Sequence, residues 1–274
     1  MAISMADIQH LRKMTGAGMM DCKNALTEAE GDFDKAIEII RKKGQAFAAK
    51  REDRDATEGC VLAATSGDFA AIVAVNCETD FVAMNGDFVG MTKSILDAAV
   101  ANKPADMDTL KALKVGDRTV AELVTDRMGV TGEKMELNVY EQITAPTVVA
   151  YVHPGNKLAA IVGFNKANVD EQVAKDVAMQ VAAMNPAALV PEEVSAEIKE
   201  REMNIAREKA KEAGKPENLL DKIAEGALQK FYKDFTLLQQ EFIKNPKLTV
   251  AQYVSGHDKE LAVVGFKRFT LNAE

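Results

Sequence analysis

The sequence has no tryptophan, only three cysteines, and fewer basic than acidic residues. Because its formal net charge is −8 over 274 residues, it lacks the basic excess of proteins that bind nucleic acid over a broad face. We therefore expect no direct nucleic-acid partner. No run approaches the roughly 18 apolar residues of a membrane-spanning helix, so we expect no membrane partner either.

The cysteines, Cys22, Cys60 and Cys77, are widely spaced and form no C-x-x-C motif. The N-terminal stretch has no continuous apolar segment of the kind found in secretory signal peptides. An odd number of cysteines without a signal peptide is typical of the reducing cytosol. We therefore expect a cytoplasmic protein whose thiols are small buried side chains.

Recognisable catalytic motifs are missing as well. There is no glycine-rich phosphate-binding loop and no G-x-S-x-G turn that would present a nucleophilic serine. The three histidines, His10, His153 and His257, lie far apart, and none has metal-ligand spacing to a cysteine or to another histidine. We expect no cofactor, no bound metal and no catalytic residues, which favours a binding protein over an enzyme.

Residues 1–55 are predicted to form a bundle of three short helices. Ser4 and Asp32 can cap the first and the third helix, and the sequence TGAG breaks the first. Three cations followed by Gly44 predict the end of the third helix, and residues 45–59 are expected to form a polar linker with some helical character. The first helix is expected to bury one apolar face, formed by Ile8, Leu11 and Met14.

An internal repeat follows. Residues 59–76 form two apolar runs around Ser-Gly-Asp, which predicts a β-hairpin, and residues 147–165 repeat the pattern around Pro154-Gly155-Asn156. Each copy precedes an alanine-rich amphipathic helix, and a further strand is expected to join each sheet. These features predict an α+β fold with two related subdomains built on antiparallel sheets. The predicted subdomains are residues 56–146, and residues 147–190 together with 236–274.

The composition becomes highly charged over residues 191–235, where a thin apolar seam runs along two helical segments separated by AGKP. A narrow seam on charged helices predicts an inserted helical hairpin, or coiled coil, that stands in solvent. The hairpin is either a solvated surface feature or a protruding contact arm. The sequence does not decide whether the protein forms a homodimer or a dimer of heterodimers.

The stretch NCETDFVA (residues 76–83) leaves the predicted strand with a carboxylate beside a large aromatic residue. Asp80 can be a turn or helix cap, a catalytic acid or a metal ligand. Phe81 can turn back into the core, or the pair can act on another molecule. Spacing alone does not decide among these interpretations.

Two longer stretches carry a resemblance. LRKMTGAGMMDCKNAL (residues 11–26) closely resembles the N-terminal signature of the bacterial elongation factor Ts family, and VNCETDFVA (residues 75–83) resembles its second signature. The resemblance extends along nearly the whole chain. Ala74 and Met84 depart from the usual residues that flank the second signature. Some members carry an additional C-terminal helix that grips the partner, a contact we expect to be missing here.

The resemblance implies a guanine-nucleotide exchange factor that binds elongation factor Tu in its GDP-bound and nucleotide-free states. It implies a ubiquitin-associated-like N-terminal bundle and a coiled-coil insertion. One segment would dislodge Mg²⁺ from the partner's nucleotide site, with its phenylalanine as a wedge: Thr79, Asp80, Phe81 and Val82. A second set would grip the same domain of the partner: Arg12, Met19, Met20 and Lys23. His153 would approach the interface near Phe81, and the second subdomain would touch another domain of the partner.

Two other functions compete with this one. The protein could be a ubiquitin-associated-type adaptor that captures a partner through Met19 and Met20 without exchange activity. It could also be an acid–base enzyme that uses Asp80 and His153. Measuring GDP release from elongation factor Tu separates an exchange factor from an adaptor, whereas activity on a small molecule without a protein partner would favour the enzyme.

Overall fold

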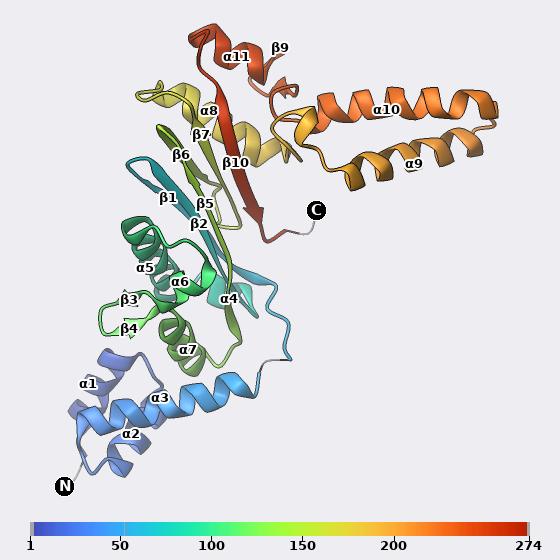
Figure 1. Cartoon of the computed structure of the whole chain (residues 1–274). Coiled ribbons are helices and arrows are strands. Elements are labelled where there is room, and N and C mark those ends of the chain that lie inside the picture. The colour runs from blue at the N-terminus through green and yellow to red at the C-terminus, as the bar shows by residue number, and fades with distance from the viewer. Residues whose placement is uncertain (1–2, 52, 273–274) are drawn as a thin grey trace.

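The computed structural model describes residues 3–51 and 53–272. Helices combine with antiparallel sheets, which confirms the predicted α+β class. Figure 1 shows an elongated molecule, with the N-terminal helices at one end and a pair of long helices projecting sideways near the other end.

Three helices open the chain: α1 (Met5–Thr15), α2 (Met19–Glu28) and α3 (Phe33–Ala49). The predicted caps are confirmed, because Ser4 forms a capping box with Asp7 and Asp32 Oδ1 accepts from the Lys35 N–H at 3.1 Å. A buried apolar cluster holds the helices together: Ile8, Leu11, Ala17, Cys22, Ala25, Leu26, Ala29 and Ala36. The expectation that Met14 is buried was wrong. Met14 is 54% exposed and borders a cleft towards the rest of the molecule.

The predicted end of the third helix at Gly44 was also wrong. The helix α3 continues to Ala49 and packs along α7 (Val120–Thr131). A Cβ atom added to Gly129 would lie only 2.8 Å from the Cα atom of Gly44, so the two backbones touch here. Gly44 therefore permits a close helix crossing, and the tertiary contact overrides the local stop signal.

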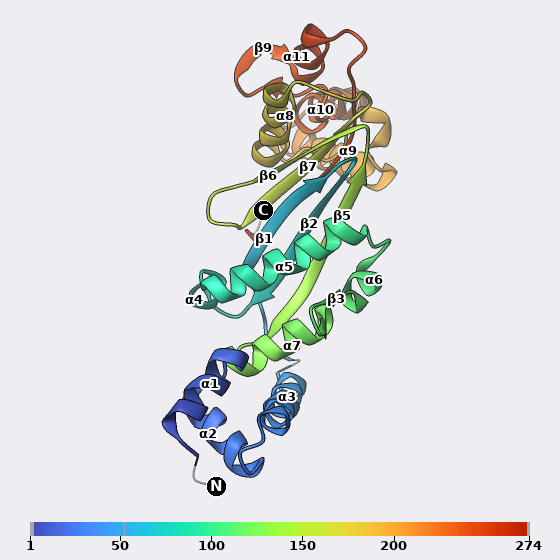
Figure 2. The same ribbon diagram turned by 90° about the vertical axis from the view of Figure 1, so that its left-hand side faces the viewer.

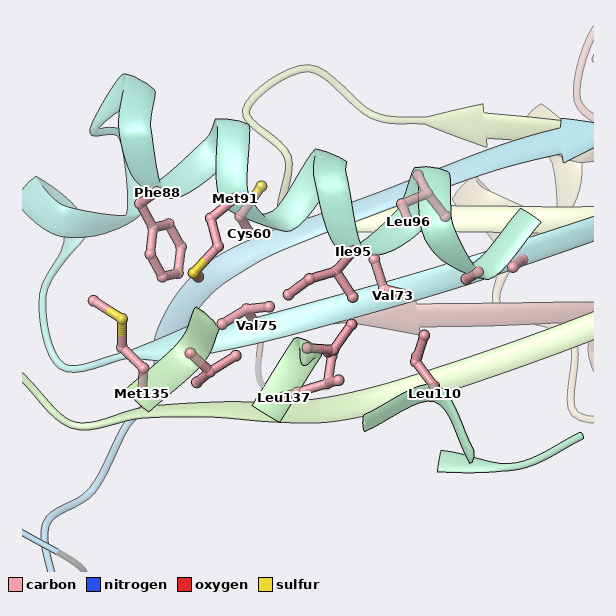
Figure 3. Packing of buried hydrophobic residues seen from close by; sticks show 14 of the residues in the cluster. Cys60, Val73, Val75, Phe88, Met91, Ile95, Leu96, Leu110, Met135 and Leu137 are labelled. Atoms are coloured by element: carbon pink, nitrogen blue, oxygen red, sulfur yellow. The ribbon is translucent and has the colours of Figure 1, made fainter. Parts of the chain in front are cut away.

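The first sheet has the strand order β1-β2-β5, formed by β1 (Glu58–Ser66), β2 (Phe69–Cys77) and β5 (Met135–Thr144). The predicted hairpin and third strand are confirmed. Helix α5 (Gly86–Asn102) covers one face, and Figure 3 shows its side chains Phe88, Met91, Ile95 and Leu96 directed at the sheet. Three short elements were not predicted: α6 (Met107–Ala112), β3 (Lys114–Val115) and β4 (Arg118–Thr119).

The second sheet repeats this arrangement with the order β10-β7-β6, formed by β6 (Thr147–Val152), β7 (Leu158–Phe164) and β10 (Val263–Thr270). Its hairpin and final strand are likewise confirmed. Helix α8 (Glu171–Met184) takes the place of α5, and β8 (Glu241–Phe242), β9 (Asn245–Thr249) and α11 (Val250–His257) follow. The repeat extends to TVAELV and TVAQYV, in which Thr119 and Thr249 each form a capping box at the start of α7 and α11.

The two sheets pack face to face through a fully buried cluster: Val61, Ala70, Ile72, Ala74, Ala159 and Ile161. Helices cover the outer faces, so the central part of the molecule has four layers, as Figure 2 shows from the side. Burying one such large apolar side chain contributes about 1.5–3 kcal/mol. The shared interior therefore fixes the two sheets against each other.

The projecting pair consists of α9 (Ala196–Glu212) and α10 (Leu220–Phe235), with short 3₁₀ turns η1 (Pro191–Glu193) and η2 (Glu217–Leu219) before each. Ala210 and Ala224 are buried where the helices meet, and Arg207 Nε lies 2.8 Å from Asp221 Oδ1. The predicted divisions after residues 55, 146, 190 and 235 stay predictions. So do the ubiquitin-associated-like character of the bundle and the coiled-coil character of this pair.

Candidate functional site

The signature segment lies at the junction between β2 and α5, where the chain forms one helical turn, α4 (Asp80–Ala83). Thr79 caps this turn, because its Oγ1 accepts from the Val82 N–H at 3.4 Å. Ala83 is buried beneath the turn, while the side chain of Phe81 is 82% exposed. Phe81 is therefore not a core residue, and a large aromatic ring stands in solvent on an ordered turn.

Two carboxylates connect the segment just before this turn to the start of β5. Glu133, which precedes β5, accepts through Oε2 from the N–H groups of Glu78 (3.2 Å) and Thr79 (3.0 Å). Its Oε1 accepts from the Thr79 hydroxyl at 2.6 Å. In return, Glu78 Oε1 accepts from the Lys134 N–H at 2.6 Å. The start of α4 is thus tied to the start of β5 by four hydrogen bonds.

Two arginines from the segment after α3 complete the arrangement. Arg51 Nη1 lies 3.1 Å from one oxygen of Glu78, and Arg54 Nη1 lies 2.9 Å from the other. Burial raises the pKa of Glu78, but the Lys134 N–H and the two guanidinium groups outweigh this effect and bring the pKa below its usual value. Glu78 is therefore ionised at neutral pH and joins the N-terminal segment to the junction.

A groove of about 720 Å³ opens beside the turn. Asp80 and Met84 from the junction line one part of it, and His153 from the turn after β6 lines another. The structure thus brings Asp80 and His153 to one groove, while Phe81 lies outside its lining. In the described part of the chain, no hydrogen bond joins the two residues, and His153 Nδ1 instead lies 3.0 Å from Tyr151 Oη. The contact of His153 with Tyr151 gives little support to an acid–base couple of Asp80 and His153.

The N-terminal candidates lie on α1 and α2, on either side of the turn at Gly16. Met20 is 64% exposed, and Arg12 and Lys23 are exposed, whereas Met19 is half-buried and packs on the bundle core. Within residues 3–51 and 53–272, no hydrogen bond or ion pair joins these candidates to α4. A cleft of about 610 Å³ nevertheless lies between the end of α1 and the start of α5, and it is bordered by Met14, Gly86 and Asp87.

The described residues offer little covalent or metal chemistry. Within residues 3–51 and 53–272, no group of three or more His, Cys, Asp or Glu side chains is arranged to hold a metal ion. Burial raises the pKa of Cys60 to about 11 and that of Cys77 to about 12, so both thiols are neutral at pH 7. Over the same residues, no helix is long and apolar enough to cross a bilayer.

The residues that sequence analysis missed are those that support the turn: Arg51, Arg54, Glu78 and Glu133. Glu78 stands inside the stretch NCETDFVA, so its position beside the exposed turn was a usable signal. Glu133 meets Thr79 across a separation of 54 residues, which no local pattern reveals.

Comparison with known proteins agrees with this picture. The profile of the family described as Elongation factor TS matches residues 78–273. Elongation factor Ts of Porphyromonas gingivalis is 62% identical over 275 residues, and that of Azobacteroides pseudotrichonymphae is 57% identical over 274 residues. Elongation factor Ts of Bacteroides thetaiotaomicron is 49% identical over 331 aligned positions. Each comparison covers 100% of both chains. The chain therefore belongs to the elongation factor Ts family of translation elongation factors.

Proposed function

We propose that the protein binds elongation factor Tu in its GDP-bound form and promotes GDP release, so that the partner can be reloaded with GTP. The observation that carries the proposal is Phe81, 82% exposed on a turn whose backbone is held from two sides. Met84 is 70% exposed three residues later, so the turn presents two large apolar side chains to solvent. Such a patch is suited to contact with another protein.

The proposed mechanism needs no bond chemistry in this chain. A bound GDP is held largely through its phosphates, and Mg²⁺ bridges a phosphate to protein oxygens. Thr79, Asp80, Phe81 and Val82 would dislodge that ion from the partner's site, with Phe81 as the wedge. Burying the ring in an apolar slot of the partner would yield about 1.5–3 kcal/mol, which is available to hold a displaced helix.

Turnover follows from reciprocity. If a factor lowers the affinity of its partner for nucleotide, nucleotide lowers the affinity of the partner for the factor to the same extent. Incoming GTP would therefore displace the protein from its partner. The protein acts by binding and is not an enzyme in the usual sense.

Further contacts would position the wedge. The exposed side chains Arg12, Met20 and Lys23, with the half-buried Met19, would grip the same domain of elongation factor Tu, and His153 would contribute from the groove beside Asp80. Residues of the second sheet and its helices would meet another domain of the partner. The hairpin of α9 and α10 is free to contact the partner or a second copy. Nucleic acid and membranes have no part in this proposal, which places the protein in the cytoplasm.

Release of fluorescent GDP from elongation factor Tu, measured with and without this protein, tests the proposal. We expect release to be accelerated at substoichiometric amounts, because each molecule is recycled by nucleotide. Binding without acceleration would instead identify an adaptor that captures elongation factor Tu. Absence of both binding and acceleration would overturn the proposal.

A further inference from the structure

We propose that Glu133 is a positioning residue for the Phe81 turn, acting through Thr79. This inference rests on the proposed exchange function, to which it adds the group that presets the wedge. The carboxylate of Glu133 forms its hydrogen bonds with Glu78 and Thr79, the two residues that precede α4.

The first sheet ends just before the Phe81 turn. The ladder between β2 and β5 closes with the pair Cys77 and Met135. Beyond it, the N–H groups of Glu78 and Thr79 have no further strand partner, and Glu133 Oε2 accepts from both of them. The carboxylate therefore extends the connection between the two strands by two residues.

The Thr79 hydroxyl links Glu133 to α4. It donates its proton to Glu133 Oε1 at 2.6 Å, which leaves its oxygen to accept from the Val82 N–H at 3.4 Å. The carbonyl oxygen of Thr79 accepts from the Ala83 N–H at 3.1 Å. Glu133 thus fixes both the backbone and the side chain of the residue that caps α4. Through that residue, it sets the direction in which the turn presents Phe81.

A wedge that must enter a narrow slot binds better when its conformation is already fixed, because less ordering remains to be done on association. An exposed phenylalanine has no packing of its own to fix it, so order must come from the backbone beneath. Glu78 works in the same sense from the other strand, through the Lys134 N–H and the arginines Arg51 and Arg54.

The experiment compares full-length variants. Glu133→Ala removes all three bonds, Glu133→Gln keeps an acceptor for the two N–H groups and adds a donor for the hydroxyl, and Glu136→Ala is the matched control. Glu136 is an exposed glutamate three residues further along, in β5. Thermal unfolding establishes that each variant is folded.

Two readouts are needed. Amide hydrogen exchange in the free protein should show the N–H groups of Glu78 and Thr79 protected in the wild type and Glu133→Gln, but exposed in Glu133→Ala. GDP release from elongation factor Tu should fall by about tenfold in Glu133→Ala, equivalent to about 1.4 kcal/mol. It should fall far less in Glu133→Gln and remain unchanged in Glu136→Ala.

A double variant separates positioning from general damage. If Glu133 acts through the wedge, Glu133→Ala should add little to the loss already caused by Phe81→Ala, because coupled residues are not additive. Full additivity, or unprotected Glu78 and Thr79 amides in the wild type, would overturn the positioning role. So would normal GDP release by Glu133→Ala alongside an impaired Phe81→Ala, which would leave the exchange function standing. If the wild type itself fails to accelerate release, the exchange function fails and the positioning role fails with it.

Discussion

The two sheets are joined to their covering helices by junctions of different length. After β2, the α5 cap Asn85 lies nine residues beyond Asn76. After β7, the α8 cap Asp170 lies only five residues beyond Asn165, which matches Asn76 in the repeated stretch AAIV-x-x-N. The first junction is longer by four residues, the length of α4, which carries Phe81.

Polar groups hold the shorter junction. Asn165 Nδ2 donates to the carbonyl oxygen of Glu260 at 2.9 Å, and Lys166 Nζ lies 2.7 Å from Asp258. No large hydrophobic side chain of the described chain is exposed within residues 165–170. Since this junction closes without an exposed apolar turn, the fold does not require one after β2. This difference supports the proposal that the longer junction contacts another molecule, in line with the general tendency of loops on a rigid scaffold to carry function.

The largest effect is expected from making the first junction as short as the second. Deleting Asp80–Ala83 removes the proposed wedge, so GDP release should return to the rate of elongation factor Tu alone. Stability should fall by roughly 2–4 kcal/mol, as for an emptied core position, because Ala83 is buried and Val82 is partly buried. Urea unfolding should remain cooperative. A folded deletion variant that still accelerates release would show that the turn is not the functional part.

A smaller effect is expected at the N-terminal bundle, which is proposed to form a second contact with the partner. Met20→Asp should weaken binding of elongation factor Tu about tenfold, equivalent to about 1.4 kcal/mol, with little change in melting temperature. Met19→Asp is the informative neighbour, because Met19 packs on the bundle core and a charge there should lower the melting temperature. A large drop in melting temperature for Met20→Asp would make it a structural residue.

The second half has its own addition, since α9 and α10 stand where the first half has only α6. Replacing residues 196–226 with a short glycine-rich loop should leave both sheets folded, because the closure free energy changes by only about 0.6 kcal/mol per doubling of loop length. Circular dichroism during urea unfolding should show one cooperative transition, and its loss would place the hairpin within the core. If the hairpin forms a dimer, light scattering should report a smaller species after excision.

The smallest expected effect is on the pH dependence of stability, and it concerns the matching helices α7 and α11. Leu123 in α7 corresponds to Tyr253 in α11. The Tyr253 hydroxyl donates to buried Asp176 at 2.9 Å, and burial followed by this carboxylate raises the pKa of Tyr253 from 10.0 to about 12. A raised pKa means that the stability from neutral Tyr253 is fully present below pH 10 and is lost as pH rises through about 12. Between these values, Tyr253→Phe should lose stability less steeply with pH than the wild type. Equal slopes in urea unfolding would contradict this.

Sequence patterns predicted the elements that depend on neighbouring residues. Both hairpins carry apolar runs around turn residues, and the caps at Ser4 and Asp32 need only a donor three residues away. The stop signal at Gly44 failed because a helix distant in the chain decided the outcome. The short strands β3, β4, β8 and β9 were missed because two to five residues carry no visible alternation.

The candidate site likewise contains residues that local sequence patterns revealed and residues that only the tertiary fold reveals. Its central residues, Asp80 and Phe81, were found from their place at a strand end and from a resemblance, but spacing could not decide whether Phe81 was buried. Exposure depends on what packs over a turn, which is a property of the whole fold. The carboxylate of Glu133 was missed because only the pairing of β2 with β5 brings it to Thr79.

The exposed ring itself is the most direct test of the account. We expect Phe81→Ala to accelerate the release of labelled GDP from elongation factor Tu some thirtyfold less than the wild type does, in stopped-flow measurements at millimolar Mg²⁺. This loss is equivalent to about 2 kcal/mol. The free energy of unfolding of Phe81→Ala should change by about 1 kcal/mol or less, as at most surface sites. With excess chelator, the deficit should narrow, because the ion that the turn is proposed to dislodge is already gone. An unchanged release rate in a well-folded Phe81→Ala protein would contradict the account.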